Sequence, residues 1–418
     1  MSPSIGRAAA ALILIAAAAC SDSTAGPSEG VVPITALPRE LSVAEQALVG
    51  ASNGFAIDLV RRVRAAAPDS TIFLSPLSAS MALGMTMNGA AGDTRMQMEE
   101  MLGFSGLSAA EINVAYRDLI ALLRELDRRV DLRVANAIFH RDVFVMEPPF
   151  LNDARGYFGA RVEGLDFNDP RAADHINRWV REATEDRIDG IIDPPIDANT
   201  MAFLMNAIYF KGDWTGQFDP RDTYSGPFHL ESGGSRMVRF MVKDDSVGLR
   251  SSDSWSGVEL PYGGGAWVMT IAVPRPGYDV DAVLADLESI LDPTAEWRSG
   301  NVRLHLPRFE LEWGRTLNDD LQALGMVDAF EPGAADFTPM YAAARDVGLH
   351  VANVKQKTFL KVDEEGTEAA AVTVVEWGIV CACGPPEVRV DRPFFLAIRE
   401  RFSGTVLFAG VIVEAPLD

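Results

Sequence analysis

Cysteine is scarce in this chain, with three residues among 418: Cys20, Cys381 and Cys383. A disulfide framework is excluded, because Cys20 lies near the N-terminus and a bridge between Cys381 and Cys383, one residue apart, would be strained. Two neighbouring thiols also fall short of the four nitrogen or sulfur ligands of a structural zinc site. We therefore expect no metal and no cofactor.

The chain also has far fewer basic than acidic residues. The 37 Lys and Arg residues stand against 59 Asp and Glu residues, which gives a formal net charge of -22. Such a charge repels phosphate backbones and anionic membrane surfaces, so we expect no nucleic-acid partner. The composition is otherwise globular, at 48% hydrophobic and 23% charged residues, and the chain is long enough to bury a large core.

Common catalytic motifs are missing as well. The chain has no Walker loop, no Gly-x-Gly-x-x-Gly and no His-Glu-x-x-His. Its histidines lie scattered, without acidic residues at the spacing of a catalytic pair, at His140, His175, His229, His305 and His350. We do not expect an enzyme.

The N-terminus predicts export. Arg7 precedes an apolar stretch, 8–19, that is too short to span a bilayer as a mature helix. Ala17-Ala18-Ala19-Cys20 resembles a bacterial lipobox, in which the cysteine is lipidated, although Ala17 stands where Leu is usual. Ordinary secretion after cleavage at an Ala-x-Ala site is the alternative. We expect a signal peptide over 1–20, a flexible Ser/Gly/Pro-rich tether over 21–40 and a folded domain over 41–418.

Hydrophobic periodicity predicts a mixed α and β domain. Helical spacing is found over 41–66, 78–84, 108–130 and 174–192, the last with Ile176, Trp179, Val180 and Ile188 as its buried stripe. Short apolar runs predict strands over 133–139, 202–210, 267–273, 302–306, 394–399 and 406–411. No repeat and no composition break within 41–418 indicates a second domain.

One C-terminal segment, 361–373, has the composition of a strand that can move. Gly366 gives its backbone freedom, and Glu364, Glu365 and Glu368 keep it soluble. Every second residue carries a small side chain, and in a strand these side chains lie on the same face. Such a strand can slide between two others without a clash. That face contains Thr367, Ala369, Ala371 and Thr373. On composition alone, an exposed loop beside an edge strand is the alternative.

Nine separated motifs, in order, resemble those of the serpin family over about 41–416. Among the most specific are Asn206–Trp214, Glu259–Tyr262 and Asp391–Phe394. The others are Phe73–Ser78, Asn88–Thr94, Val134–Phe139, Ile176–Val180, Leu304–Phe309 and Gly404–Gly410. The resemblance implies a single α+β domain of the serpin fold, with a large central, mostly antiparallel sheet, two smaller sheets, about nine helices and an exposed reactive centre loop over about 364–386.

The resemblance also implies a protease inhibitor that acts once. A serine protease, or a cysteine protease as a second class, cuts the loop and forms an acyl-enzyme, and the freed part of the loop inserts as a new central strand. The partner is then the target protease, held covalently by a monomer. A hinge without proline favours this reading: Glu364, Glu365, Gly366, Thr367, Glu368, Ala369, Ala370, Ala371, Val372 and Thr373. The rival is a non-inhibitory serpin-fold protein that serves as a surface binding or carrier module.

The two ends of the loop give different positions for the scissile bond. Counting about fourteen residues from Gly366 gives Val380-Cys381, whereas counting back from Pro385 gives Ala382-Cys383. We prefer the first, because the length of the inserted strand constrains the hinge side more tightly. Either residue is small and aliphatic, which suits elastase-like or subtilisin-like proteases and disfavours trypsin-like ones.

A polar cluster under the central sheet is implied too. Ser75, Pro76, Ser78 and Asn206 match the family's shutter, and Gln356 stands where many serpins carry a histidine. Because Gln is neutral, we expect a network of Ser75, Ser78, Asn206 and Gln356 that is insensitive to pH near 6.5. Trp214 matches a tryptophan near the loop's entry point.

Arginines over 117–133 lie where some serpins bind a polyanion. Acidic residues alternate with them in this chain, including Asp118, Glu125, Asp127 and Asp131. We therefore expect an ion-paired, solvated helix face and no activation by heparin-like polyanions.

Overall fold

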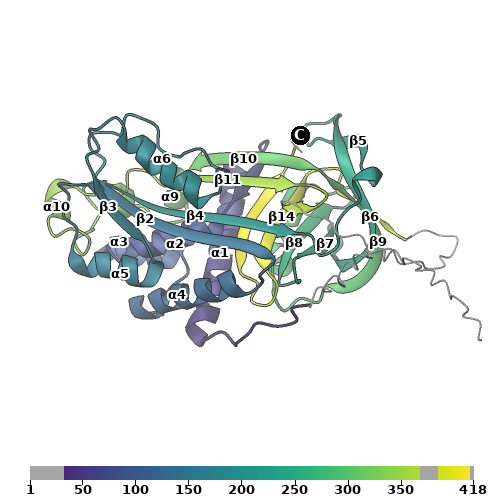
Figure 1. The fold of residues 1–418 in the computed structure, drawn as a ribbon, viewed down its shortest axis with the longest axis horizontal. Helices are drawn as coiled ribbons and strands as arrows, with labels where there is room; N and C mark the ends of the chain where they lie inside the picture. Colours follow the sequence, from purple (N-terminus) through teal and green to yellow (C-terminus); the bar gives the residue numbers. More distant parts are fainter. Residues whose placement is uncertain (1–32, 368–384, 415–418) are drawn as a thin grey trace, which may run out of the picture. The chain divides into compact units, whose positions relative to one another are not determined.

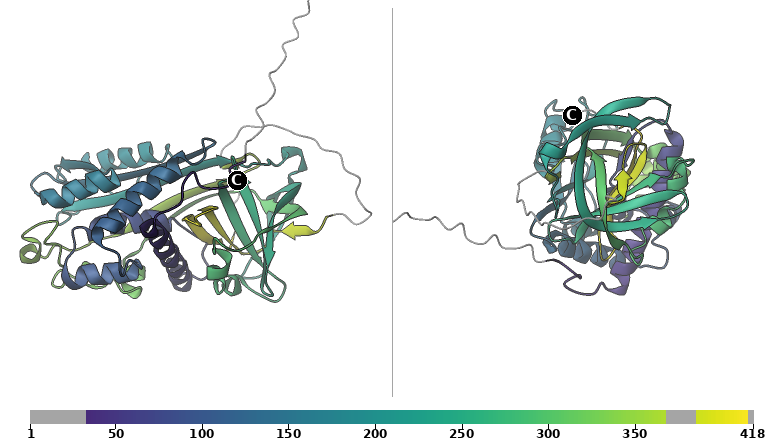
Figure 2. Two further views of the ribbon diagram at one scale, coloured as in Figure 1. Left: turned by 90° about the horizontal axis from the view of Figure 1, so that it is seen from below. Right: turned by 90° about the vertical axis from the view of Figure 1, so that its right-hand side faces the viewer.

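A strongly curved nine-stranded sheet forms one end of the fold (Figures 1 and 2). The structure is a computed structural model that describes residues 33–367 and 385–414. The strands of the sheet follow the order β1 (Ile72–Leu74), β15 (Val406–Ile412), β14 (Phe394–Glu400), β8 (Trp267–Pro274), β7 (Trp255–Tyr262), β6 (Ser235–Ser251), β9 (Arg298–Pro307) and β13 (Glu387–Arg389), with β5 (Tyr224–His229) paired to β6. The long strand β6 pairs with β5, β7 and β9 in turn, so it joins what would otherwise be two smaller sheets.

The central sheet consists of two parts. One contains β12 (Gly366–Thr367), β4 (Ala202–Asp213), β2 (Val130–Arg141) and β3 (Arg161–Leu165), and the other contains β10 (Phe309–Thr316) and β11 (Lys355–Val362). All these pairs are antiparallel except β2 with β3. In the described ranges no ladder joins β4 to β11, although these strands run side by side and line the same cavities.

Ten α-helices surround the sheets in the described residues, close to the nine expected. They are α1 (Val43–Ala66), α2 (Pro76–Met87), α3 (Gly92–Met101), α4 (Ala109–Glu125), α5 (Pro148–Phe158), α6 (Ala172–Ala183), α7 (Val280–Leu284), α8 (Leu287–Ile290), α9 (Asn318–Ala323) and α10 (Ala344–Val347), with short 3-10 turns at Pro220–Asp222 and Asp328–Phe330. Reciprocal capping boxes begin α1, between Ser42 and Glu45, and α4, between Ser108 and Glu111. None of the helices described is long and apolar enough to cross a membrane.

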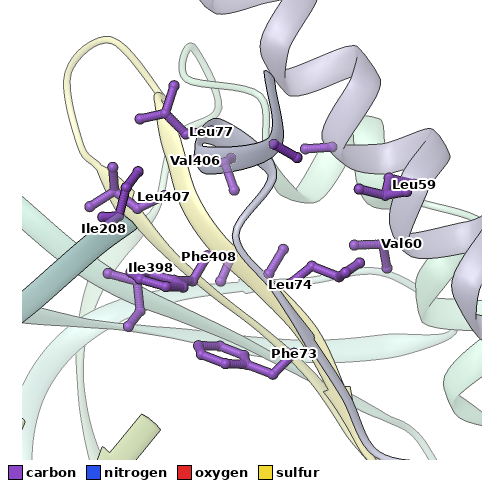
Figure 3. Packing of buried hydrophobic residues seen from close by; sticks show 14 of the residues in the cluster. Leu59, Val60, Phe73, Leu74, Leu77, Ile208, Ile398, Val406, Leu407 and Phe408 are labelled. Carbon is purple, nitrogen blue, oxygen red and sulfur yellow. The ribbon is translucent and has the colours of Figure 1, made fainter. Parts of the chain in front are cut away.

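The main core lies between helices α1 and α2 and the strands β1 and β15 (Figure 3). Phe73 of β1 stacks on Phe408 of β15 with ring centroids 5.3 Å apart. Leu59 and Leu77 contribute fully buried side chains from the two helices. A second cluster places Trp179 of α6 over β2 and β4, so this helix covers the outer face of the central sheet.

Two predicted helices end early. The helix expected over 108–130 ends at Glu125, because Asp127 accepts hydrogen bonds from the backbone of Arg129 and Gly264 and the chain then enters β2. The helix expected over 174–192 ends at Ala183, because the Thr184 hydroxyl bonds within the last turn and the next two residues have positive φ. Ile188 is nevertheless buried, from the loop that follows.

Eight strands lie outside those predicted from the sequence: β1, β3, β5, β6, β7, β10, β11 and β13. Strand β12 lies within the segment 361–373 that was expected to form a strand. The expected fold class is found in the described residues: one α+β domain with a mostly antiparallel central sheet. The described residues from Pro33 onward belong to one compact unit.

Candidate functional site

A slot separates the facing edges of β4 and β11. Its largest part is a cavity of about 860 Å³, lined by residues 202–208 of β4, by residues 355–358 of β11 and by α2. A small cavity of about 30 Å³ continues between residues 208–211 and 359–361. Edge strands offer unpaired backbone N–H and C=O groups, so the slot has the chemistry needed to receive an additional strand.

The hinge enters this slot at one end. Gly366 pairs with Asp213 and Thr367 pairs with Gly212, antiparallel to β4. The Asp363 carboxylate holds the preceding turn by accepting hydrogen bonds from the backbone N–H groups of Glu365, at 3.1 Å, and Gly366, at 3.3 Å. Two hinge residues therefore already occupy the position where an inserted strand would begin.

Gly366 is required at that position. Its φ is +144°, and an added Cβ would lie 2.5 Å from the Asp213 Cα and 2.5 Å from the Gly212 carbonyl oxygen. Only glycine adopts this backbone conformation without strain, and only glycine leaves space for β4 to approach. The other predicted loop residues lie outside the described residues: Glu368, Ala369, Ala370, Ala371, Val372, Thr373, Val380, Cys381, Ala382 and Cys383.

Glu364 differs from the expectation that it only keeps the loop soluble. It is 4% exposed, accepts a hydrogen bond from the Thr223 hydroxyl at 2.8 Å and pairs with Arg308 at 3.2 Å. Its carbonyl accepts from the backbone N–H of Phe218 at 2.9 Å. The sequence did not indicate this anchor, because Thr223 and Arg308 are distant in the chain. Glu364 thus ties the base of the hinge to the body.

Trp214 lies next to the residues that precede Gly366. Its ring stacks on Tyr262 with centroids 4.4 Å apart, and its indole Nε1 donates to the Asp363 carbonyl at 2.9 Å. Its backbone N–H donates to the Glu365 carbonyl at 3.0 Å. The indole therefore contacts the residues that must move if the hinge moves.

A buried lysine supports the same entry loop. Lys243 of β6 donates to the Gly216 carbonyl at 2.6 Å, pairs with Asp245 at 2.9 Å and lies 4.7 Å from the centre of the Phe218 ring. Burial lowers the pKa of this ammonium group. Burial also raises the pKa of Asp213, the partner of Gly366, with the nearby Glu365 carboxylate acting in the same direction. Neither Lys243 nor Asp213 was predicted from the sequence as a site residue.

The predicted polar network forms in two separate parts within the slot. Gln356 of β11 accepts from the Ser75 backbone N–H at 3.0 Å and donates to the Ser75 carbonyl at 2.8 Å. Across the slot, the Ser78 hydroxyl donates to the Asn206 backbone carbonyl at 3.4 Å, and the Asn206 amide donates to the Asn136 side chain at 2.8 Å. No bond joins the two parts in the described structure, and Pro76 serves only as the first residue of α2.

Asn136 is a member of this cluster that sequence reasoning missed. It is buried, and its amide also donates to the Phe158 carbonyl at 2.8 Å. The sequence did offer a sign of it, because Asn136 is a polar residue within the apolar strand predicted over 133–139. The Asn206 Oδ1 atom is buried without a hydrogen-bond partner in the described chain, so one acceptor remains open at the slot.

The arginines over 117–133 are paired as expected where the structure gives partners. Arg117 pairs with Asp118 at 2.7 Å, and Arg133 pairs with Asp131 at 2.7 Å and also with Glu185. No group of three or more metal-ligating side chains occurs among the described residues.

Comparisons with known proteins agree with this geometry. A family described as "Serpin (serine protease inhibitor)" matches residues 50–415. Leukocyte elastase inhibitor A of Mus musculus is 33% identical over 379 residues, covering 87% of this chain and 98% of the relative. Iripin-5 of Ixodes ricinus is 33% identical over 374 residues, covering 87% of this chain and 93% of the relative.

Solved structures give the same result. Human thyroxine-binding globulin aligns with a TM-score of 0.79 at 27% identity, covering 90% of this chain and all of that one (100%). Tengpin, described as a thermophilic serpin in its native state, aligns with a TM-score of 0.78 at 27% identity, covering 91% of this chain and 96% of that one. The fold, the slot and these similarities lead to one conclusion: the chain belongs to the serpin family.

Proposed function

We propose that this protein is a single-use inhibitor of serine proteases, with cysteine proteases as a second target class, and that it works by inserting its cleaved loop into the slot between β4 and β11. The observation that carries the proposal is the hinge. Gly366 and Thr367 already pair with β4 as an antiparallel strand at the open end of an unfilled slot. A strand that continues from them along β4 fills the slot edge to edge.

The chemistry begins as ordinary proteolysis. The catalytic serine oxygen attacks the carbonyl carbon of Val380, the bond to the Cys381 nitrogen breaks, and the new amine leaves with a proton. The loop is then attached to the body only at its hinge, while the protease remains esterified to Val380. Insertion along β4 carries the protease with it and distorts its active site before water can hydrolyse the ester.

Small aliphatic residues at the cut favour elastase-like and subtilisin-like targets. Val380 is the preferred residue before the cut and Ala382 is the second choice. The relatives named leukocyte elastase inhibitor, at 33% identity in Mus musculus and 34% in Sus scrofa, support this target class. The protein acts as a monomer, and the target protease is its covalent partner.

Export is a further part of the proposal. The apolar stretch before Cys20 directs the chain out of the cytoplasm, and Cys20 carries a lipid that anchors it to a bacterial cell envelope. Metabolic labelling with a fatty acid tests the anchor: label on the wild type and none on Cys20→Ser is expected. An unlabelled wild type found in the medium would leave plain secretion.

The inhibitory activity is tested with purified residues 21–418 incubated with pancreatic elastase, a subtilisin or trypsin. A covalent complex stable in SDS and a released peptide that starts at Cys381 are expected with the first two enzymes. A peptide that starts at Cys383 moves the cut to Ala382. Clipping with a fully active protease and no gain in thermal stability would refute the proposal and favour a carrier, a role suggested by the similarity to thyroxine-binding globulin.

A further inference from the structure

The cavity of about 860 Å³ beside β4 and β11 touches both apolar clusters of the protein. Leu83, Phe337 and Met340 line it from the main core, and Trp179 and Ile191 line it from the cluster under α6. Sites for small organic molecules have volumes of about 300–1,000 Å³ and are mostly apolar. The cavity therefore has the size and the lining of such a site.

Small side chains on α2 leave this space. Ser78, Ala79 and Ala82 all line the cavity, and their spacing of one, three and four residues places them on one face of the helix. Ile208 of β4 and Phe408 of β15, both labelled in Figure 3, add apolar surface to the lining. A bulky side chain on this face of α2 would occupy the volume that a ligand needs.

One hydrogen-bond acceptor of the lining is open. The Asn136 amide nitrogen donates to the Phe158 carbonyl at 2.8 Å, so its oxygen accepts from Asn206 Nδ2, also at 2.8 Å. This pairing fixes the orientation of the Asn206 amide. Asn206 Oδ1 is then buried without a partner in the part of the chain that the structure describes. Because a buried acceptor without a hydrogen bond is costly, a ligand that donates to this oxygen gains affinity.

The charged side chains of the lining all lie at the protein surface. Asp193, Asp197, His350, Lys355 and Lys357 are exposed, and Asp193 pairs with Lys355 at 3.2 Å. Among the described residues, the buried part of the lining contains no carboxylate, amine, guanidinium or imidazole group. A charged ligand would lose its hydration there without gaining a counter-ion. The lining therefore favours an uncharged molecule.

We propose that this cavity binds an uncharged, largely apolar organic molecule that carries one hydrogen-bond donor, and that Asn206 Oδ1 accepts a hydrogen bond from that donor. The bound molecule lies against residues 202–208 of β4 and 355–358 of β11, so it competes with any strand that adds to β4. The competition rests on the proposed inhibitory function, whereas the binding itself does not.

The test is a fluorescence titration of purified residues 21–418 with N-phenyl-1-naphthylamine. This probe is uncharged, has one N–H donor and fluoresces more strongly in apolar surroundings. We expect one saturable site per chain. 8-Anilino-1-naphthalenesulfonate has the same skeleton with an added sulfonate, and we expect it to bind about tenfold more weakly or worse. No saturable binding of the first probe would overturn the site, and equal affinity for both probes would overturn the uncharged class of ligand.

Two variants place the probe in the cavity. Ala82→Phe fills the space from α2 and is expected to weaken binding by roughly tenfold or more. Ala109→Phe is the matched control, because Ala109 is also partly buried on a helix, α4, but lies outside the cavity lining. It is expected to bind the probe like the wild type. Wild-type affinity in Ala82→Phe, with thermal melting showing that both variants are folded, would overturn the site.

Asn206→Leu tests the hydrogen bond. It is expected to weaken the probe by roughly threefold to tenfold, the cost of one hydrogen bond. 1-Phenylnaphthalene, which lacks the N–H donor and is measured by displacement of the probe, is expected to keep its affinity. An equal loss for both compounds would overturn the role of Asn206. Should Asn206→Leu fail to fold, the wild type alone decides, because equal affinity for the two compounds would overturn that role as well.

A separate measurement concerns the competition with an added strand. The inhibitory capacity of the wild type against pancreatic elastase is expected to fall at saturating N-phenyl-1-naphthylamine, whereas the capacity of Ala82→Phe is expected to respond less. An unchanged capacity in an active inhibitor that binds the probe would overturn the competition. The titrations need no protease, so saturable binding by a protein that never inhibits would support the site while the proposed function fails.

Discussion

The hinge glycine offers the sharpest test of the insertion mechanism. In Gly366→Ala the new methyl group meets the backbone of Asp213 and Gly212 at 2.5 Å, and φ of +144° is strained for any residue with a Cβ. Such strain costs about 2 kcal/mol, and the uncut variant relieves it by releasing residue 366 from β4; because insertion restores the pairing, it is slowed by up to about thirtyfold. More of the acyl-enzyme then hydrolyses before it is trapped.

The assay is the stoichiometry of inhibition, the number of inhibitor molecules consumed per protease trapped. We expect a value near one for the wild type and a several-fold higher value for Gly366→Ala, with more clipped inhibitor on an SDS gel. Trp214, which contacts Asp363 and Glu365, supplies a fluorescence signal for the rate of insertion.

Gly277→Ala is the matched control, because Gly277 also has a positive φ, of +93°, but an added Cβ there has no heavy atom within 4 Å. It is expected to lower thermal stability slightly and leave the stoichiometry unchanged. A Gly366→Ala protein that inhibits with wild-type stoichiometry and rate would refute the role assigned to β12.

Three further predictions follow from other contacts. Gln356→Ala removes both bonds to the Ser75 backbone and is expected to cost about 2 kcal/mol, seen as a lower urea midpoint; an unchanged midpoint would mean that water replaces the amide. Arg399→Met leaves the buried Glu259 without its ion-pair partner and is expected to lower the free energy of unfolding in urea by about 3–5 kcal/mol. The double variant Arg399→Met/Glu259→Met is expected to recover most of that free energy. An equal loss of stability in the single and the double variant would contradict the pairing. Heparin is expected to change the rate of inhibition less than about twofold, because Arg117 and Arg133 already pair with carboxylates, and a tenfold rise would show that a polyanion displaces them.

Local patterns predicted those parts of the fold whose signal lies within a few residues. The first helix was expected over 41–66 and is found over 43–66, because Ser42 and Glu45 cap it reciprocally and its apolar face is continuous. Strand β6 was missed because its side chains alternate between both charges and apolar groups, and its partners β5, β7 and β9 are supplied from elsewhere in the chain. Pairing over such distances leaves little local trace.

In the candidate site, too, the features with a local sequence pattern were predicted and those that depend on distant residues were not. The motif Asn206–Trp214 drew attention to Trp214, which contacts Asp363 and Glu365, and the composition of 361–373 drew attention to Gly366, which pairs with β4. The burial of Glu364 was not predicted, because it depends on Arg308 and Thr223, which only the folded sheets bring to it. The polar cluster was predicted as one network and is found in two parts, because the slot that separates β4 from β11 leaves no sequence pattern.

The position of β14 and β15 in the large sheet limits how early that sheet can form during synthesis. Strand β15 lies between β1 and β14, and Ile72 pairs with Val411. Until the ribosome has released residues 394–412, the early strand β1 has no neighbour, and Phe73 lacks the ring of Phe408 on which it stacks. The large sheet therefore closes late in synthesis, and until then β1 and β8 expose apolar edges that a chaperone can cover.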